Sequence, residues 1–474
     1  MTGLKRKIGL AIGIGTICLS TGILVHAGNG TSKAQDPGPR GNAVGAGLPF
    51  TSLTGNQLAF FDDGQARFEQ VDSVSGTVNG EPGVGLGPGF NANSCVSCHA
   101  QPAPGGSSPS TSAYPNIGPN PQVQIANDAN ATNTLPSFIT LNGPVREARF
   151  PLQVSSSGKL TLFADGGVHD LFTIAGRSDA ENCSMAQPNF QQMQQLNNII
   201  FRIPTPVFGA GLIEAIPDST ILANMNSNTS LKKQYGIGGQ PNTSGNDGTI
   251  TRFGWKAQNK SLEIFAGEAY NVEIGVTNEL FPNERNNAPA SCIYNATPED
   301  STNFDLVGDQ ILSDTVEFAM FMRFLAPPTP SSVGISTNPS AASIANGQSL
   351  FSQVHCDLCH TPTLQTGSSA FPVLSNQTAA LYSDLLVHHM GFGLADGITQ
   401  GGAGPDQFRT APLWGLGQRV FFLHDGRANP TNGGLVTAIQ DHAGIGSEAN
   451  AVVGFFNGLT QSQQQDLLNF LRSL

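Results

Sequence analysis

Apolar residues recur at helical spacing in three separate stretches of this chain. Residues 316–325, VEFAMFMRFL, predict an apolar helix, and residues 459–474 predict an amphipathic one. The interval 250–280 also predicts a helix. The side chains on its shared face are Trp255, Leu262, Phe265, Ala266 and Ala269. Residues 100–135, by contrast, are polar and rich in Gly and Pro, which predicts a long loop; a surface loop is the plainer interpretation, and a loop that covers the edge of a bound group is the alternative.

Two pairs of segments repeat along the chain. GQARFEQV (64–71) shares Gly, Gln, Phe, Gln and Val with GQSLFSQV (347–354) at the same offsets. FRIPTPVFGAG (201–211) is echoed by FRTAPLWGLG (408–417). We therefore expect one structural unit to occur twice, with large insertions in the first copy.

A Pro- and Ser-rich stretch at 326–340 separates the two copies and predicts a linker. We accordingly expect an N-terminal domain over 48–325 and a C-terminal domain over 341–474, preceded by a flexible linker at 28–47. Gly supplies 56 and Pro 31 of the 474 residues, and only 12% of residues are charged. That composition favours a loop-rich fold with short helices.

Each copy also carries the spacing C-x-x-C-H. The residues are Cys95, Cys98 and His99 in the first copy, and Cys356, Cys359 and His360 in the second. This spacing serves the covalent attachment of c-type haem, in which two thioethers hold the vinyl groups and the histidine ligates the iron. A disulfide needs no histidine at a fixed offset, and a zinc site usually brings a second pair of ligands. The two motifs together predict two covalently bound c-type haems.

The N-terminal residues predict export from the cytoplasm. Lys5, Arg6 and Lys7 precede an apolar run at 8–25, and a small-residue cleavage site follows, so 1–27 predicts a signal peptide. The run is long for a signal core, which leaves an uncleaved inner-membrane anchor as the alternative. We expect a periplasmic protein, a compartment that suits covalent haem attachment. The net charge of −12 argues against nucleic-acid binding.

The chain has seven cysteines. Cys18 lies in the export segment, and four others belong to the two motifs. Cys183 and Cys292 remain, and an even remainder in an oxidising compartment suggests a disulfide between them. Two separate buried thiols are the alternative.

Several longer stretches resemble a known family. The two C-x-x-C-H motifs, the loop FRTAPLWGLGQRVFFLHDGR and the closing helix resemble the bacterial di-haem cytochrome c peroxidase superfamily. FNANSCVSCHAQPAPGGSSP, PVFGAGLIEAIPD, RFGWKAQ, VTNELFP and LLVHHMGFGLADGI are similar to its di-haem oxidoreductase branch. The resemblance extends from about Leu48 to the C-terminus. It implies a mainly α fold of two cytochrome-c-like haem domains with few or no strands.

The resemblance also implies a peroxidase-like oxidoreductase. Electrons would pass from the C-terminal haem to the N-terminal haem, which would reduce hydrogen peroxide or oxidise another small molecule. A small redox protein or a quinol-linked donor would supply the electrons. The alternative is a di-haem electron-transfer cytochrome without catalysis of its own.

The second axial ligand of each iron decides between electron transfer and catalysis. The peroxidases place an axial methionine seven residues after a helix-opening leucine, and here that position is His442, counted from Leu435. Met390 is the alternative ligand of the C-terminal haem, and His442 would then be a surface histidine near a helix end. For the N-terminal haem, residues 100–168 contain no histidine. Either His169 folds back to this iron or its second position is open, and we favour the open position.

Splitting an O–O bond needs an acid–base group near the open iron. Glu268 lies near the position in the first copy that corresponds to His442 in the second. Glu263 and Glu273 are the alternatives, and a glutamate that faces solvent is the plainer interpretation. In the peroxidases a tryptophan lies between the haems. Trp255 and Trp414, the only tryptophans, are candidates for that role, and core packing is the plainer one.

Other polar residues have weaker signals. Arg202 and Arg409 open equivalent loops and are expected to pair with haem propionates, because a guanidinium matches a carboxylate. Residues 242–249, NTSGNDGT, have the oxygen-rich composition of a calcium loop, and related peroxidases bind calcium between domains; an ordinary turn is the alternative. Three further histidines, His388, His389 and His424, are expected to form structural hydrogen bonds.

Overall fold

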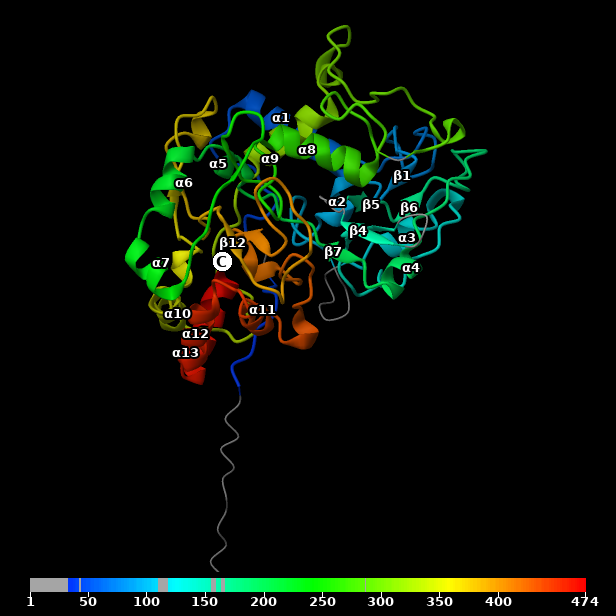
Figure 1. Ribbon diagram of the computed structural model, residues 1–474. Helices are drawn as coiled ribbons and strands as arrows, with labels where there is room; N and C mark the ends of the chain where they lie inside the picture. Colours follow the sequence, from blue (N-terminus) through cyan, green and yellow to red (C-terminus); the bar gives the residue numbers. More distant parts are fainter. Residues whose placement is uncertain (1–32, 42–43, 110–117, 155–158, 163–166, 286) are drawn as a thin grey trace, which may run out of the picture. The chain divides into compact units, whose positions relative to one another are not determined.

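Short helices and long ordered connections make up the structure (Figure 1). The computed structural model describes residues 33–41, 44–109, 118–154, 159–162, 167–285 and 287–474. The export segment predicted at 1–27 and part of the linker at 28–47 lie outside these residues. Residues 34–474 form one compact unit, and the domain boundaries expected within it stay a prediction. In the part of the chain that the structure describes, no helix is long and apolar enough to cross a membrane.

Four helices are longer than the rest. They are α1 (Gly55–Glu69), α9 (Asp314–Phe324), α10 (Ala341–Gln353) and α13 (Gln461–Ser473). The shorter α-helices are α2 (Cys95–Cys98), α3 (Gln122–Ile125), α4 (Phe190–Gln195), α5 (Ala210–Glu214), α6 (Asp218–Met225), α7 (Thr229–Tyr235), α8 (Leu262–Ala269), α11 (Leu435–Asp441) and α12 (Asn450–Gly458). Helix α8 continues directly into a π-helical turn, η2 (Tyr270–Ile274). The 3-10 turns are η1 (Asp128–Asn130), η3 (Ala290–Cys292), η4 (Gly308–Ile311), η5 (Cys356–Leu358), η6 (Pro372–Leu374), η7 (Leu416–Gln418) and η8 (Pro430–Asn432).

Among the described residues, thirteen short strands pair antiparallel in small sheets. One sheet has three strands in the order β5-β2-β7, formed by Val168–His169, Glu147–Arg149 and Ile200–Arg202. The two-stranded pairs are β1 (Gly89–Phe90) with β6 (Phe172–Thr173), β3 (Leu152–Val154) with β4 (Leu160–Leu162), β8 (Asn242–Thr243) with β9 (Ile250–Thr251), β10 (Leu364–Gln365) with β11 (Thr378–Ala379), and β12 (Val387–His389) with β13 (Gln407–Arg409).

The expected mainly α fold with few or no strands is therefore wrong. Helices hold 32% of the described residues and strands 12%, so loops are the largest class. The physical reason lies in the connections. Buried backbone groups need hydrogen-bond partners, and in the Gly- and Pro-rich connections they find them in two- and three-residue ladders rather than in helices.

The first copy of the repeat is built on two helices that cross at a glycine. Helix α1 begins at a capping box, in which Thr54 and Gln57 bond each other's backbone N–H. Halfway along, Gly64 lies so close to α9 that a Cβ there would meet the backbone oxygen of Glu317. The pair of helices therefore needs glycine at this position.

The second copy repeats this crossing with different helices. Gly347 of α10 lies against α13, where an added Cβ would meet the backbone oxygen of Asp466. Gly347 occupies the same offset in GQSLFSQV as Gly64 in GQARFEQV. The structure thus gives both copies the same helix pair, with α9 and α13 as the closing helices.

A second pair of glycines is equivalent in the same way. Gly211 in α5 and Gly417 in η7 lie against the ends of the closing helices, where a Cβ would meet the backbone oxygens of Arg323 and Arg472. Each of these turns follows a glycine with positive φ, Gly209 or Gly415. The segments that repeat in the sequence therefore also make equivalent packing contacts in the two copies.

The predicted helices have mixed outcomes. Residues 316–325 and 459–474 correspond to α9 and α13. The helix expected within 250–280 is shorter, because α8 begins at Leu262. Trp255 instead lies in a turn between Gly254 and Ala257, which both have positive φ. A left-handed backbone cannot continue a right-handed helix, so the apolar face predicted through Trp255 is interrupted.

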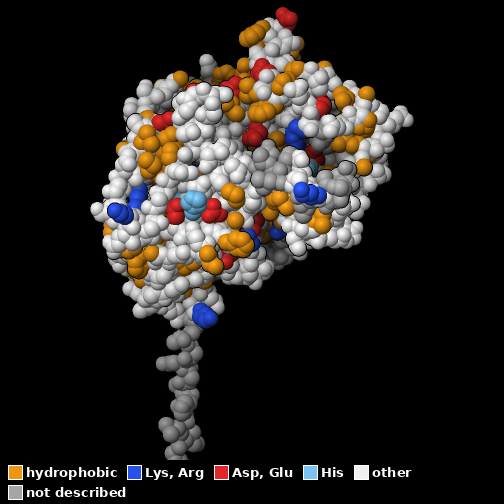
Figure 2. All heavy atoms as spheres, in the orientation of Figure 1, with side chains coloured by type: hydrophobic (Ala, Val, Ile, Leu, Met, Phe, Trp, Pro, Cys, Tyr) orange, Lys and Arg blue, Asp and Glu red, His pale blue; other side chains and the backbone are white. Residues whose placement is uncertain are grey.

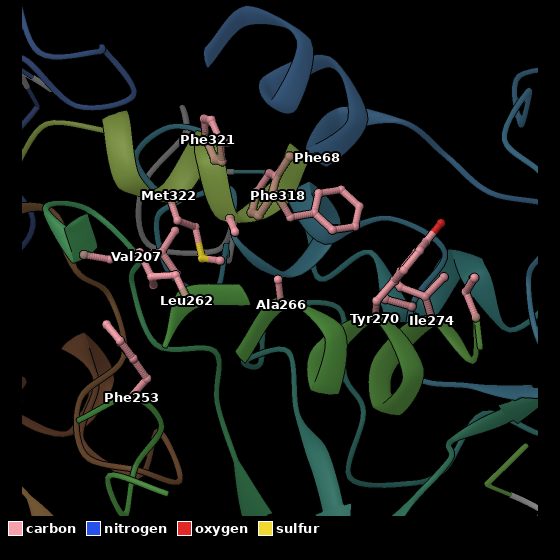
Figure 3. Close-up of a cluster of buried hydrophobic side chains, with 14 of the residues drawn as sticks. Phe68, Val207, Phe253, Leu262, Ala266, Tyr270, Ile274, Phe318, Phe321 and Met322 are labelled. Atoms are coloured by element: carbon pink, nitrogen blue, oxygen red, sulfur yellow. The ribbon is translucent and has the colours of Figure 1, made fainter. Parts of the chain in front are cut away.

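The buried core follows the two helix pairs. The larger cluster includes Phe61, Phe68, Phe318, Phe321 and Met322, part of which is drawn in Figure 3. A second cluster is formed by side chains of α10, α13 and neighbouring segments. On the face shown in Figure 2, Lys and Arg side chains are few and scattered, which agrees with the acidic composition.

Candidate functional site

The first C-x-x-C-H motif occupies a single helical turn. Ser94 caps α2 by accepting a hydrogen bond from the backbone N–H of Ser97, and the His99 N–H donates to the Cys95 carbonyl at 3.1 Å. Cys95, Cys98 and His99 all line one cavity. The turn thus presents two thiols and one imidazole to the same space.

A backbone carbonyl sets the chemistry of His99. Its Nδ1 lies 3.0 Å from the Gly106 oxygen, and because a carbonyl only accepts, Nδ1 carries the proton. Nε2 is then an unprotonated ligand atom. Burial lowers the pKa of His99 to about 4, so the ring is neutral. The 100–135 segment was expected to be a surface loop, but Gly105 to Pro109 are buried and hold this histidine.

The second motif repeats this geometry. The His360 N–H donates to the Cys356 carbonyl at 2.9 Å, and His360 Nδ1 donates to the Tyr382 carbonyl at 2.9 Å. Burial again lowers the pKa of the histidine to about 4. Phe351 lies edge-on to His360 with ring centroids 6.4 Å apart, as Phe68 does to His99 at 6.0 Å.

The two cavities fit a large apolar group that carries carboxylates. They enclose about 1080 Å³ and about 1450 Å³ of space, part of it open to solvent, and apolar atoms form most of both walls. In the first cavity, the Nε atoms of Arg146 and Arg202 are buried without a hydrogen-bond partner. In the second cavity, Arg409 Nη1 and Arg419 Nε are also buried without a hydrogen-bond partner.

Buried guanidinium atoms without partners are costly, and a bound carboxylate would satisfy them. Burial lowers the pKa of Arg409 and of Arg419 to about 10, which reflects the missing counter-charge. A haem has two propionates and an apolar ring, so the residues of each cavity fit one haem. Arg146 and Arg419 were not singled out in the sequence, because no motif marks them.

Arg202 differs from Arg409 in its partners. Its Nη2 lies 2.6 Å from the buried carboxylate of Asp396, which also lies 3.1 Å from Lys256 Nζ. Arg202 Nη1 donates to Gln400 Oε1 at 2.7 Å, and its Nε is buried without a partner. Arg409 donates Nε to the Gly254 carbonyl and keeps Nη1 free.

The second cavity contains a second neutral imidazole. His442 ends α11, and its Nδ1 donates to the Ala438 carbonyl at 2.6 Å, which leaves Nε2 unprotonated. Burial lowers the pKa of His442, and His442 in turn lowers the pKa of His360. Met390 lines the same cavity, so the structure places both predicted ligands there.

Three other histidines of this cavity, His355, His388 and His424, have different surroundings. His388 lies between two carboxylates, with Nδ1 2.7 Å from Glu448 and Nε2 3.0 Å from Asp384. Although burial opposes the charged form, interactions with Cys359 and Asp384 raise the pKa of His388 well above the usual value, and each of its ring nitrogens already lies against a carboxylate. His424 stacks on Phe408 at 4.3 Å.

The first cavity has no second imidazole on its wall. His99 is the only histidine, and Met322 the only methionine, among the described residues that line it. His169 is not among them; it stacks on Phe150 with ring centroids 3.7 Å apart. The structure therefore does not bring His169 to the motif.

Two glutamates meet in the first cavity. Glu147 accepts from Arg149 Nε at 2.5 Å, and its carboxylate and that of Glu273 are hydrogen-bonded to each other. The arginine keeps the pKa of Glu147 low. Burial and the neighbouring Glu147 charge raise the pKa of Glu273 well above its usual value. One carboxylate and one protonated carboxyl thus face the cavity together.

Glu268 is not on the cavity wall, and its side chain binds Asn259. Ala266, Ala269, Tyr270 and Glu273 line the cavity at helical spacing. The apolar face predicted from Phe265, Ala266 and Ala269 leads to Glu273, four residues beyond Ala269, and not to Glu268. The periodicity could therefore have selected Glu273, whereas the analogy with His442 did not.

Trp255 lines both cavities, and no other described residue does. Its indole N–H donates to the Ile203 carbonyl at 2.8 Å, which fixes the ring in the shared wall. Trp414 lines neither cavity and packs against Gly209 in the core. The structure thus shows which of the two tryptophans lies between the cavities, whereas the sequence could not distinguish them.

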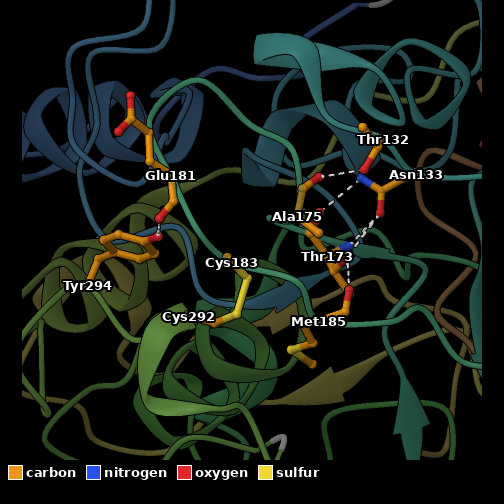
Figure 4. Close-up of a disulfide and its surroundings, with 9 residues drawn as sticks. All are labelled: Thr132, Asn133, Thr173, Ala175, Glu181, Cys183, Met185, Cys292 and Tyr294. Atoms are coloured by element: carbon orange, nitrogen blue, oxygen red, sulfur yellow. Dashed lines mark hydrogen bonds between the residues drawn. A yellow bond between two sulfur atoms is a disulfide. The ribbon is translucent and has the colours of Figure 1, made fainter.

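Two further predicted features lie away from the cavities. Cys183 and Cys292 form a disulfide that joins segments 109 residues apart (Figure 4). In the 242–249 segment, the single carboxylate, Asp247, pairs with Lys260 and accepts from Thr249. This is the geometry of a turn between β8 and β9 rather than of a calcium loop.

Comparison with known proteins assigns a family to this arrangement. Residues 156–474 match the family described as "Di-haem oxidoreductase, putative peroxidase". No curated protein matches the chain. A structure of hydrazine synthase from Kuenenia stuttgartiensis aligns with 44% of this chain at 16% identity and a TM-score of 0.23. The alignment spans 60% of the length of that other chain.

Proposed function

Because the chain belongs to the di-haem oxidoreductase family, we propose that each C-x-x-C-H motif holds one covalently bound haem c. Cys95 and Cys98 would form the thioethers of the first, with His99 as its iron ligand. Cys356, Cys359 and His360 would hold the second. When bound, the haem irons supply one-electron chemistry and, where a coordination position is open, a place for a small oxidant.

One observation carries the assignment of roles to the two cavities. In the second cavity two imidazoles, His360 and His442, donate Nδ1 to a backbone carbonyl and present Nε2, whereas the first cavity has one such ring, His99, together with a pair of carboxyl groups. Two fixed ligands suit electron transfer, since the ligand set then changes little between oxidation states. One fixed ligand beside an acid–base pair suits chemistry on a small molecule. We therefore assign peroxide reduction to the first cavity and electron entry to the second.

The carboxyl pair supplies protons in the first cavity. Reducing hydrogen peroxide to water consumes two electrons and two protons. Glu273 is held in its protonated form by burial and by Glu147, so it can donate a proton to the departing oxygen. The Arg149 guanidinium keeps Glu147 ionised, and Glu147 can accept the next proton from solvent. These roles replace the one that the sequence suggested for Glu268.

Electrons would cross between the cavities at Trp255. Its indole is the described side chain that forms part of both walls, which supports this route. The donor would be a small redox protein or a quinol-linked carrier in the periplasm, where the export segment of the sequence directs the chain. Calcium has no part in the proposal, because Asp247 is paired with Lys260.

Peroxide consumption by the reduced, haem-loaded protein tests the proposal. We expect Glu273→Gln to slow consumption by about 10²–10⁴-fold, because an amide cannot donate the proton of a carboxylic acid. Glu268→Gln is the matched control, on the same helix but off the cavity wall, and should retain the rate. A wild-type protein that is low-spin at both irons and inert to peroxide would contradict the proposal and favour an electron-transfer cytochrome.

A further inference from the structure

Tyr270 is a phenol on the wall of the first cavity that the proposed peroxide chemistry does not use. It is 3% exposed and lies at the start of the π-helical turn η2, one helical turn before Glu273. π-helical turns occur frequently at functional sites. Figure 3 shows its side chain beside Ile274, with the phenol oxygen pointing away from the apolar cluster.

The phenol has a proton acceptor of its own. Its O–H donates to Asp314 Oδ2 at 3.0 Å, at the first residue of α9. Asp314 is 22% exposed and pairs through Oδ1 with Arg67 Nε at 3.4 Å, and Arg67 is itself 32% exposed. A proton that reaches Asp314 can therefore leave to solvent without crossing the cavity.

Trp255 lacks such an acceptor. Its indole N–H donates to a backbone carbonyl, that of Ile203, which cannot take up a proton. A phenol that loses an electron becomes a strong acid and passes its proton to a neighbouring base. Tyr270 and Trp255 therefore differ in kind, since of these two only Tyr270 is paired with a group that can receive its proton.

We propose that Tyr270 is a redox-active residue of the first cavity, with Asp314 as the base that takes its proton. The inference rests on the proposed function, because hydrogen peroxide is its oxidant. Tyr270 supplies one of the two electrons that peroxide takes up, its O–H bond breaks, and the proton moves to Asp314 Oδ2. A neutral phenoxyl radical remains on Tyr270. The other electron arrives by way of Trp255.

The balance of the reaction closes with groups on the same wall. The two protons that the peroxide oxygens need come from Glu273 and from solvent, so the phenol proton is not consumed. One further electron from the donor and the proton held at Asp314 restore the phenol. The Tyr270–Asp314 pair thus allows peroxide to take up two electrons in the first cavity before a second electron has arrived from the donor.

Freeze-quenched electron paramagnetic resonance of the haem-loaded protein, mixed with hydrogen peroxide, tests the inference. We expect a radical signal whose hyperfine structure changes when the protein is made with ring-deuterated tyrosine. Tyr270→Phe should abolish it, and Asp314→Asn should reduce its yield, since an amide is a poor base. Tyr294→Phe is the control, because the Tyr294 hydroxyl donates to the Glu181 backbone carbonyl; the signal should persist.

Haem content and the visible spectrum of each variant show whether it has folded. If Tyr270→Phe does not fold, Asp314→Asn still tests the inference. Peroxide consumption without any tyrosine signal, or a signal that survives Tyr270→Phe, overturns this inference alone. A wild-type protein that does not consume peroxide overturns the proposed function, and the inference with it.

Discussion

At the scale of single residues, backbone carbonyls determine which histidine nitrogens are available as ligands. Gly106, Tyr382 and Ala438 each accept from a histidine Nδ1, so three rings present Nε2. The sequence could predict His99 and His360, because the motif fixes their spacing to the cysteines. It could not show that the carbonyls of Gly106 and Tyr382, 7 and 22 residues away from these histidines, would orient the rings.

His442 is the residue whose replacement should change the second haem most. We expect His442→Ala to retain both haems but to convert one from low-spin to high-spin, because the ring that supplies the second ligand is lost. His442→Met should remain low-spin and raise the reduction potential, since a thioether favours ferrous iron. Visible and electron paramagnetic spectra with a redox titration measure both effects.

Met390→Leu is the control for His442, because Met390 lines the same cavity. We expect its spectra to match those of the wild type. The opposite result, a high-spin haem in Met390→Leu and an unchanged spectrum in His442→Ala, would make Met390 the ligand.

Glu299 should give the folded protein a measurable pH dependence. Burial raises its pKa to about 8, despite hydrogen bonds from the Thr277 N–H and hydroxyl, whereas in the unfolded chain the pKa is near 4.5. The folded state therefore holds a proton that the unfolded state releases. This contribution to stability is complete below about pH 4.5 and is lost as the pH rises through about 8.

The test of Glu299 is a set of melting curves between pH 6 and pH 8.5. One such proton changes the free energy of unfolding by at most about 1.4 kcal/mol per pH unit. We expect the melting temperature of Glu299→Gln to fall less with rising pH than that of the wild type, while the exposed control Glu181→Gln follows the wild type. Parallel curves for Glu299→Gln and the wild type would refute the assignment.

At the scale of elements, glycines hold the helix pairs together. Gly64→Ala would place a methyl group against the Glu317 backbone oxygen, and Gly347→Ala would do the same at Asp466. We expect each substitution to cost about 1–3 kcal/mol of unfolding free energy, because α1 and α10 must move away from their partners. Denaturant unfolding followed by circular dichroism measures this cost.

Gly454→Ala is the matched control for the two crossings. Gly454 lies inside α12 with nothing within 4 Å of an added Cβ. Alanine should there stabilise the helix by up to about 1 kcal/mol. A similar gain in Gly64→Ala would show that α1 and α9 do not meet as closely as described.

The elements also show where sequence patterns succeed and where they fail. Both closing helices could be predicted, because their apolar periodicity extends over ten residues or more. The repeated segments GQARFEQV and GQSLFSQV mark α1 and α10, the helices that pack against the closing helices. The strands could not be predicted, since pairs of two or three residues, such as β1 with β6, have no period to detect. The π-helical turn that carries Tyr270 and Glu273 could not be predicted either.

At the scale of the whole molecule, two similar units differ in what faces their cavities. Helix pairs, motif turns and orienting carbonyls are equivalent in both. The other lining residues differ, with His442 in one cavity and the Glu147–Glu273 pair in the other. The sequence could show the duplication and the haem motifs. It could not show that Trp255 forms part of both walls, because the shared wall exists only in the folded chain.

The central claim is that each cavity holds one haem and that only the second haem has two protein ligands. The most direct measurement is haem content by the pyridine haemochrome assay, combined with electron paramagnetic resonance. We predict two c-type haems in the wild type, one high-spin and one low-spin. Cys95→Ala/Cys98→Ala should lose the high-spin haem alone, and Cys356→Ala/Cys359→Ala the low-spin haem alone. One haem per chain, or two haems that are both low-spin, would contradict the account.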